Sequence, residues 1–227
     1  RAALDDAATR LLAEAAALYP EGYALMDAAA LRPAPEEIGL RALARVVTTV
    51  SGSSYPPRFE RTENLYRALC TSADSLAGGR TLGGCRVLPY RGRVMVCREP
   101  GAAEAAVGAA GRFQWDGRFR VEIDGDSGFE LRRLGRKGWL DAVADRPSLR
   151  QTSVPAPVRP SLPSFWHLDV VVAVPHLNYV RQWNGKDLSR VREVTFAPLR
   201  PLTGAPFISG QSDSESLTLG DAICYVS

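Results

Sequence analysis

Apolar side chains recur every three to four residues in the first third of the chain, which is the spacing of an amphipathic helix. This spacing predicts a helix over residues 4–18, which Pro20 and Gly22 then interrupt. A second helix is predicted over residues 36–51, because two acidic residues stand at its amino end, where the helix dipole favours negative charge. A third helix is predicted over residues 58–76.

After residue 79 the apolar pattern changes to a period of two, which is typical of strands. Residues 87–90 and 93–97 flank Arg91-Gly92, which reads as a two-residue hairpin turn. Cys85 and Cys97 would then point to opposite faces of the sheet, so a disulfide between them is not expected. The predicted register pairs Tyr90 with Arg93, Arg86 with Cys97, and Cys85 with Arg98.

A second hairpin turn is predicted at Trp115-Asp116-Gly117-Arg118, and residues 102–110 before it read as a short helix or a loop. The strand after the turn alternates cleanly, and residues 125–128 are expected to turn the chain into residues 129–131. On this strand, one face would carry Phe119, Val121 and Ile123, and the other Arg118, Arg120 and Glu122.

Residues 150–164 contain four prolines and read as an extended linker with a domain boundary nearby. Beyond the linker, residues 165–174 predict a strand pair and residues 191–196 one more strand. The expected fold class is α+β. Its parts would be a helical subdomain over residues 1–76, a mixed and basic hairpin subdomain over 77–150, and a β-rich subdomain over 151–227.

Composition narrows the class of protein. The chain of 227 residues is 45% hydrophobic, and no apolar run approaches the roughly 18 residues of a membrane span. Four cysteines without a C-x-x-C pair, and two histidines, indicate neither a zinc site nor a disulfide framework. We therefore expect a cytoplasmic protein with reduced thiols. Since the chain begins with Arg1 and not with Met, we expect a piece of a longer protein.

Charge is spread unevenly along the chain. Residues 80–150 hold 14 basic and 9 acidic residues, whereas residues 1–79 hold 8 and 10. A local excess of arginine favours polyanions such as nucleic acid. A solvated surface and structural ion pairs are the alternatives for each residue. The candidate phosphate-contacting residues surround the predicted junction of helix and hairpin, and they are Arg58, Arg61, Arg86, Arg91, Arg93 and Arg98.

No catalytic, cofactor-binding or metal-binding residue is predicted. His167 and His176 have no nucleophile or paired carboxylate at catalytic spacing, so core or capping roles are favoured. Asp124 and Asp126 beside Gly125 favour a turn over a metal site. The tryptophans, which could stack on bases, are more typical of packing anchors where they stand, at Trp115, Trp139, Trp166 and Trp183.

Several short motifs, in their order and spacing, resemble the carboxy-terminal region of the tRNA(Ile)-lysidine synthetases, particularly those of alphaproteobacterial type. The resemblance covers residues 36–180. It rests on Tyr55-Pro56-Pro57-Arg58, on Thr81-Leu82-Gly83-Gly84-Cys85-Arg86 with Arg98-Glu99-Pro100, on Arg159-x-x-Leu162-Pro163-x-x-Trp166, and on Val174-Pro175-His176-Leu177.

The resemblance implies an ATP-dependent ligase that adenylates the wobble cytidine of isoleucine tRNA and replaces the adenylate with lysine, so that the anticodon reads AUA. In that family the chemistry, with ATP and Mg²⁺, belongs to an amino-terminal nucleotide-binding domain, which we expect to be absent from this chain. The implied partner of the present region is isoleucine tRNA, and the region itself would need no cofactor. The chain alone would then be inactive.

One segment argues against the absence of a nucleotide-binding loop. Ser209-Gly210-Gln211-Ser212-Asp213-Ser214 is close to the S-G-G-x-D-S nucleotide loop of the family, but Gln211 replaces the second glycine and only 13 residues follow. A polar surface loop is the favoured reading. Two other classes of function therefore stay open, namely a protein-interaction or regulatory module without RNA contact, and a self-sufficient enzyme that uses this loop.

Overall fold

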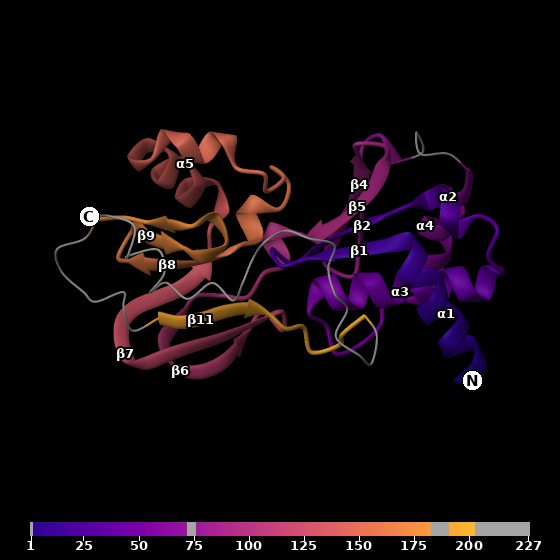
Figure 1. Cartoon of the computed structure of the whole chain (residues 1–227), viewed down its shortest axis with the longest axis horizontal. Helices are drawn as coiled ribbons and strands as arrows, with labels where there is room; N and C mark the ends of the chain where they lie inside the picture. The colour runs from indigo at the N-terminus through magenta and orange to yellow at the C-terminus, as the bar shows by residue number, and fades with distance from the viewer. Residues whose placement is uncertain (1, 72–75, 183–190, 203–227) are drawn as a thin grey trace. The chain divides into compact units, whose positions relative to one another are not determined.

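A computed structural model describes residues 2–71, 76–182 and 191–202 of the chain (Figure 1). The described residues divide into two compact units, one formed by residues 2–99 with 198–202, and the other by residues between 100 and 197. The loop-like motif at 209–214, Trp183 and Cys224 lie outside the described residues.

The first unit places helices on a five-stranded antiparallel sheet. Its helices are α1 (Ala2–Ala15), α2 (Ala28–Leu31), α3 (Glu36–Ser51) and α4 (Phe59–Thr71). The sheet order is β1 (Ala16–Tyr19), β2 (Tyr23–Met26), β5 (Arg93–Arg98), β4 (Cys85–Tyr90) and β3 (Arg80–Leu82).

Helix α3 is the central element of this unit. It packs against α1 and α4 on its sides and against β2, β4 and β5 beneath it. Gly52 ends the helix in a left-handed conformation, which a glycine adopts without steric cost. The core that α3 anchors is apolar throughout and includes Leu12, Met26, Leu43, Val46, Val47, Val50, Leu65, Leu69, Val87 and Val96.

The second unit is built around one long strand, β7 (Phe119–Arg133). Its six-stranded antiparallel sheet has the order β10 (Tyr179–Val180), β9 (Val170–Val174), β8 (Pro163–His167), β7 and β11 (Val191–Phe196), and β6 (Val107–Trp115) also pairs with β7. Helix α5 (Gly135–Asp145) packs on β9. The core of this unit includes Trp115, Phe119, Val121, Ile123, Phe129, Leu131, Phe165, Val172 and Val194.

Several sequence predictions are confirmed. The fold class is α+β, α3 has the predicted bounds, and the β4–β5 hairpin has the predicted register, in which Arg86 pairs with Cys97. Cys85 and Cys97 therefore lie on opposite faces of the sheet. The strand pairs predicted over residues 165–174 and at Trp115–Phe119, and the strand over residues 191–196, are also present.

Other predictions need correction in the first unit. The first helix ends at Ala15, and residues 16–19 are a strand that forms a hairpin with β2 through a turn closed by the Gly22 N–H and the Tyr19 carbonyl. Because β2 pairs with β5, the sheet draws strands from both sides of residue 76. The observed division at residue 99 thus differs from the expected boundary. Helix α4 ends at Thr71 among the described residues, and residues 72–75 lie outside them.

In the second unit, residues 125–128 do not turn the chain back. Gly125 and Gly128 have φ of 69° and 64°, and these left-handed positions let β7 continue as one strand. Strand β6 pairs with both halves of β7, whereas β11 pairs with its first half and β8 with its second half. Residues 107–110, predicted as helix or loop, are the start of β6.

The proline-rich residues 150–164 are not an extended linker. Val154, Val158 and Leu162 recur every fourth residue and are all buried. The prolines of the segment lie in tight turns, in one of which the Val158 N–H donates a hydrogen bond of 2.9 Å to the Pro155 carbonyl. The segment thus packs within the second unit, where α5, which the sequence did not predict, contacts it.

Candidate nucleic-acid interface

All six candidate arginines belong to the first unit, and the structure separates them into groups at the two ends of the β4–β5 hairpin. Each strand of the hairpin has six residues. At about 3.3 Å per residue its ends are about 16 Å apart. The expected single cluster around the junction of helix and hairpin is therefore two smaller groups.

One group gathers at the Gly83-Gly84 turn between β3 and β4. A Cβ atom at Gly83 would lie 2.9 Å from Val47 Cγ1 and 3.3 Å from Pro57 Cβ, so the segment before α4 packs tightly on this turn. Arg58 follows Pro57 directly. From the other side, Arg98 Nη1 donates a hydrogen bond of 3.3 Å to the Gly84 carbonyl. The close packing at Gly83 is what brings Arg58 and Arg98 to one turn.

The second group lies at the hairpin tip. Arg91 and Gly92 have φ of 50° and 76°, the left-handed pair that a tight two-residue turn requires. The Arg91 guanidinium lies 5.3 Å from the centre of the Tyr90 ring, and Arg93 follows on β5. Both arginines are exposed. They can reach a phosphate without any change in the core.

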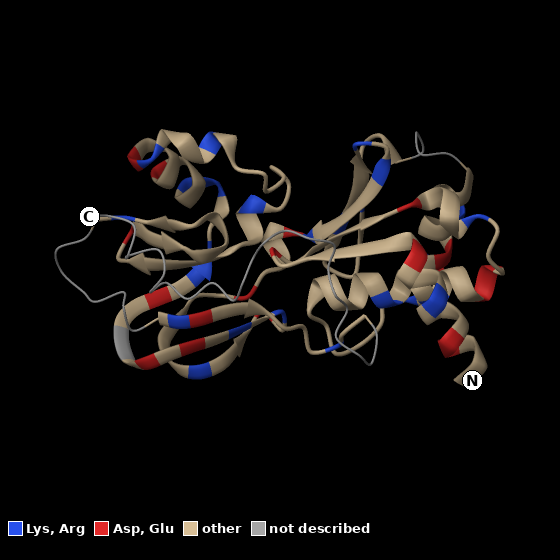
Figure 2. Ribbon diagram, in the orientation of Figure 1, with Lys and Arg blue, Asp and Glu red and all other residues tan. Residues whose placement is uncertain are grey.

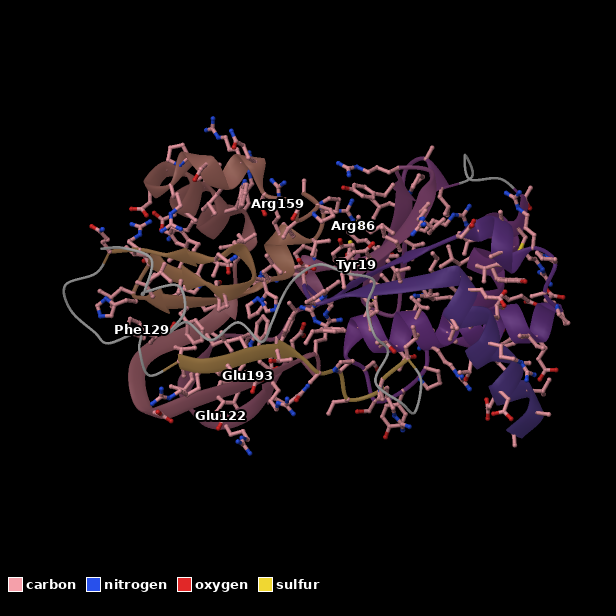
Figure 3. All side chains as sticks on the ribbon, viewed as in Figure 1. Tyr19, Arg86, Glu122, Phe129, Arg159 and Glu193 are labelled. Atoms are coloured by element: carbon pink, nitrogen blue, oxygen red, sulfur yellow. The ribbon has the colours of Figure 1, made fainter. Side chains whose placement is uncertain are left out.

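Arg61 and Arg86 extend the first group. Arg61 stands three residues after Arg58, so it lies one turn further along α4. Arg86 projects from β4 (Figure 3) and is exposed, whereas its neighbour Cys85 is buried on the opposite face. In the described part of the chain, Arg58, Arg61, Arg86 and Arg93 pair with no carboxylate. Unpaired guanidinium groups are the type that binds phosphate oxygens.

Two further arginines of the first unit, Arg41 and Arg45, are paired with carboxylates. Arg45 Nη2 lies 2.8 Å from Asp5 Oδ1, and Arg41 Nη2 lies 2.9 Å from Glu37 Oε1. The hydrogen bond from Arg41 to Glu37 raises the pKa of the Arg41 guanidinium. The positive charge of these two arginines is therefore balanced locally by Glu37 and Asp5.

In the second unit acidic and basic residues alternate along the strands, and several of the basic residues are paired (Figure 2). Glu122 and Glu193 face each other across β7 and β11 (Figure 3), which is unfavourable for like charges. Arg112 lies 2.7 Å from Glu122, and Arg120 lies 3.5 Å from Glu193, so each carboxylate has a cation. The positive charge counted over residues 80–150 therefore overstates what this unit offers to a polyanion.

Arg118 is the main residue that sequence reasoning misplaced. It was expected on the polar face, but it is fully buried. Its Nε donates to Asp116 Oδ2 at 2.7 Å and its Nη2 to the Ser161 carbonyl at 2.9 Å. The available signal was the hairpin turn itself, in which an acid and a base stand two residues apart.

The tryptophans and histidines were predicted to have packing roles, and the contacts of those in the described residues agree with this. Trp115 is buried, and the Trp166 indole N–H donates to Ser164 Oγ at 2.8 Å. His176 packs edge-on against Phe119 at 5.1 Å between ring centres. The Arg159 guanidinium lies over the Trp139 ring, 4.5 Å from the ring centre. Asp124 forms an ion pair with Arg192.

Within residues 2–71, 76–182 and 191–202, no three histidine, cysteine, aspartate or glutamate side chains form a group that could hold a metal ion. Every helix in those ranges falls short of the length and apolar character needed to cross a bilayer.

Comparison with known proteins decides the family. No protein-family model and no solved structure matches the chain. It is, however, 31% identical over 165 residues to a tRNA(Ile)-lysidine synthase of Ruegeria pomeroyi. The chain belongs to the tRNA(Ile)-lysidine synthase family. The match covers 73% of this chain and 37% of that relative, so the lysidine synthase relationship concerns little more than a third of the relative's length.

Proposed function

We propose that this chain is the tRNA-binding, carboxy-terminal portion of a lysidine synthase that acts on isoleucine tRNA. The observation that carries the proposal is the relationship to a tRNA-modifying enzyme. The exposed arginines without carboxylate partners support it, since such groups pair with the phosphates of a polynucleotide. The tRNA would be met in the cytoplasm.

We propose further that ATP, lysine and Mg²⁺ are handled by another part of the whole enzyme. Two observations support this division. Every strand pair in the described residues is antiparallel, whereas the nucleotide loop of a doubly wound domain needs a parallel sheet. The segment most similar to that loop, at 209–214, has Gln211 in place of a glycine.

The test is binding of the purified chain to isoleucine tRNA and to methionine tRNA over a series of salt concentrations. We expect binding that weakens linearly on a log–log plot of affinity against salt, because phosphate contacts release counterions. We also expect no lysine incorporation when ATP and lysine are supplied. Binding to neither tRNA would favour a protein-interaction module, and lysidine formation would refute the division of labour.

A further inference from the structure

Two large aromatic side chains of the first unit are turned into solvent. Tyr55 is 79% exposed and Phe59 is 65% exposed, and they flank Pro56, Pro57 and Arg58. Aromatic rings usually contribute the largest area to a core or an interface. Two of them in water within five residues therefore call for a partner that covers them.

The backbone holds this segment firmly. Ser53 Oγ accepts a hydrogen bond from the Tyr55 N–H at 3.1 Å and donates one to the Tyr55 carbonyl at 2.9 Å. Two prolines follow and restrict φ, and Pro57 packs on the Gly83 turn. The Thr62 N–H and hydroxyl then bond to the Arg58 carbonyl, which fixes the first turn of α4. The rings are thus displayed on an ordered frame, which lowers the entropy cost of binding.

Two adjoining hollows lie beside the aromatic segment. The first, of about 280 Å³, is mostly apolar and lies between Pro57 and Phe59 on one side and Leu40 of α3 on the other. The second, of about 520 Å³, is more polar and includes the hydroxyl-bearing residues Thr48 and Ser54. Arg41, Ala44 and Pro56 line both hollows, so they form one continuous depression with an apolar and a polar end.

The charge around the depression favours an anionic partner. Asp5 and Glu37 are paired with Arg41 and Arg45, so these four groups nearly cancel. Arg58 and Arg61 on the aromatic segment and α4, and Arg200 in the polar hollow, have no carboxylate partner among the described residues. Asp6 in the polar hollow and the exposed Glu60 between Phe59 and Arg61 offset two of these three charges, which leaves a small positive excess.

We propose that Tyr55, Phe59, Arg58 and Arg61 form a site for an unpaired nucleotide of RNA, which we call the stacking site. The inference rests on the proposed tRNA-binding function and specifies how part of it is performed. A base would stack with its face on an aromatic ring beside the apolar hollow, and the arginines would hold the flanking phosphates. Stacking needs a base whose face is free, so the site selects single-stranded over double-stranded RNA.

The test replaces both rings, in the double variant Tyr55→Ala with Phe59→Ala. Both side chains are exposed, so the circular dichroism spectrum and thermal midpoint should stay near those of the unmodified chain. Affinity for isoleucine tRNA and for a short single-stranded oligoribonucleotide should fall roughly five- to hundred-fold, as expected for loss of stacking. Affinity for a blunt RNA duplex should not change. The slope of log affinity against log salt should also be unchanged, since stacking releases no counterions.

Three control variants distinguish ring stacking from a general effect of apolar surface or of charge. Tyr55→Phe with Phe59→Tyr keeps both rings and should bind like the unmodified chain. Leu140→Ala with Leu168→Ala removes exposed apolar side chains of the second unit, which are 57% and 78% exposed, and should have no effect. Arg58→Gln with Arg61→Gln should lower the salt slope by about 0.7 for each phosphate of the single strand that is no longer bound.

The outcomes distinguish this inference from the function on which it rests. If the ring-deleted variant binds tRNA as tightly as the unmodified chain, or loses duplex binding equally, the stacking site is refuted while tRNA binding stands. If the unmodified chain binds no RNA at all, both proposals are overturned, and the exposed rings would then point to a protein partner.

Discussion

At the scale of single residues, Gly39 shows how packing overrides helix propensity. A glycine inside a helix costs about 1 kcal/mol relative to alanine. Here a Cβ atom would lie 2.2 Å from the hydroxyl oxygen of Tyr66 and 2.4 Å from its ring. Tyr66 is buried and donates to the Leu31 carbonyl at 3.2 Å, and burial raises the pKa of its hydroxyl to about 12. The glycine therefore lets α3 and α4 approach each other across this ring.

This contact predicts that Gly39→Ala is destabilising although alanine is the better helix former. We expect the free energy of unfolding to fall by about 1 to 3 kcal/mol, the usual cost of overpacking a core, as measured by urea denaturation. The matched control is Gly108→Ala, because nothing lies within 4 Å of a Cβ there. Adding Tyr66→Leu should recover part of the loss in the Gly39→Ala background. An unchanged unfolding midpoint would show that Tyr66 moves aside without cost.

At the scale of elements, the sequence predicted the helices and strands whose own residues carry a full apolar pattern and the turn signals around it. Helix α3 and the β4–β5 hairpin carry their own period and their own turn signals. Strands β1 and β2 do not, since each has only four residues. The place of β2 is set by pairing with β5, about 70 residues later, and β1 in turn pairs with β2. Helix α5 was hidden by Gly138, whose lack of a side chain makes room for the Trp166 ring.

The candidate site was predictable in part for the same reason. Exposure of Arg91 and Arg93 follows from a hairpin turn, which is a local feature. The separation of Arg58 from that tip depends on how Pro57 packs on Gly83, which is a contact between distant segments. On the helix predicted over residues 58–76, Phe59 is expected to face the core, and this prediction is wrong because Phe59 is 65% exposed. Tyr55, which precedes that helix, also faces solvent.

The turn between β6 and β7 carries an element-scale prediction. The buried pair of Asp116 and Arg118 joins this turn to the Ser161 carbonyl, and the Glu104 N–H donates to Asp116 Oδ1 at 2.9 Å. Arg118→Ala would leave a carboxylate buried beside an empty space. We expect a loss of about 3 to 5 kcal/mol in the free energy of unfolding, measured by urea denaturation.

The comparison is Arg112→Ala, which removes one side of the exposed pair with Glu122 and should change stability little. Asp116→Asn combined with Arg118→Met removes both charges and should be milder than Arg118→Ala alone. If Arg118→Ala is no more damaging than Arg112→Ala, the buried pair does not stabilise the turn.

At the scale of the whole molecule, the net charge of +3 says little about where a polyanion would bind. The basic stretch over residues 80–150 is shared by two units, and in the second unit half of its arginines are paired with carboxylates, namely Arg112, Arg118, Arg120 and Arg132. The six candidate arginines all lie in the first unit, and five of them are exposed. Phosphate contacts from such arginines position a nucleic acid without reading its sequence.

The hairpin tip offers the sharpest test of phosphate binding by these arginines. The double variant Arg91→Glu with Arg93→Glu should keep the fold intact, because both side chains are exposed and a strand accepts Glu at the position of Arg93. If each arginine makes one phosphate contact, the slope of log affinity against log salt should fall by about 1.4 to 1.8. The loss should be similar for isoleucine and methionine tRNAs, because phosphate contacts carry no sequence information.

Arg112→Glu with Arg192→Glu makes the same change in net charge elsewhere, at arginines that are paired with Glu122 and Asp124. This control separates a local contact from a general electrostatic effect. An equal loss in both double variants would mean that overall charge, and not the hairpin tip, governs binding. A loss at the tip confined to isoleucine tRNA would mean that Arg91 and Arg93 recognise tRNA identity, because a contact to the common phosphate backbone must weaken both tRNAs alike.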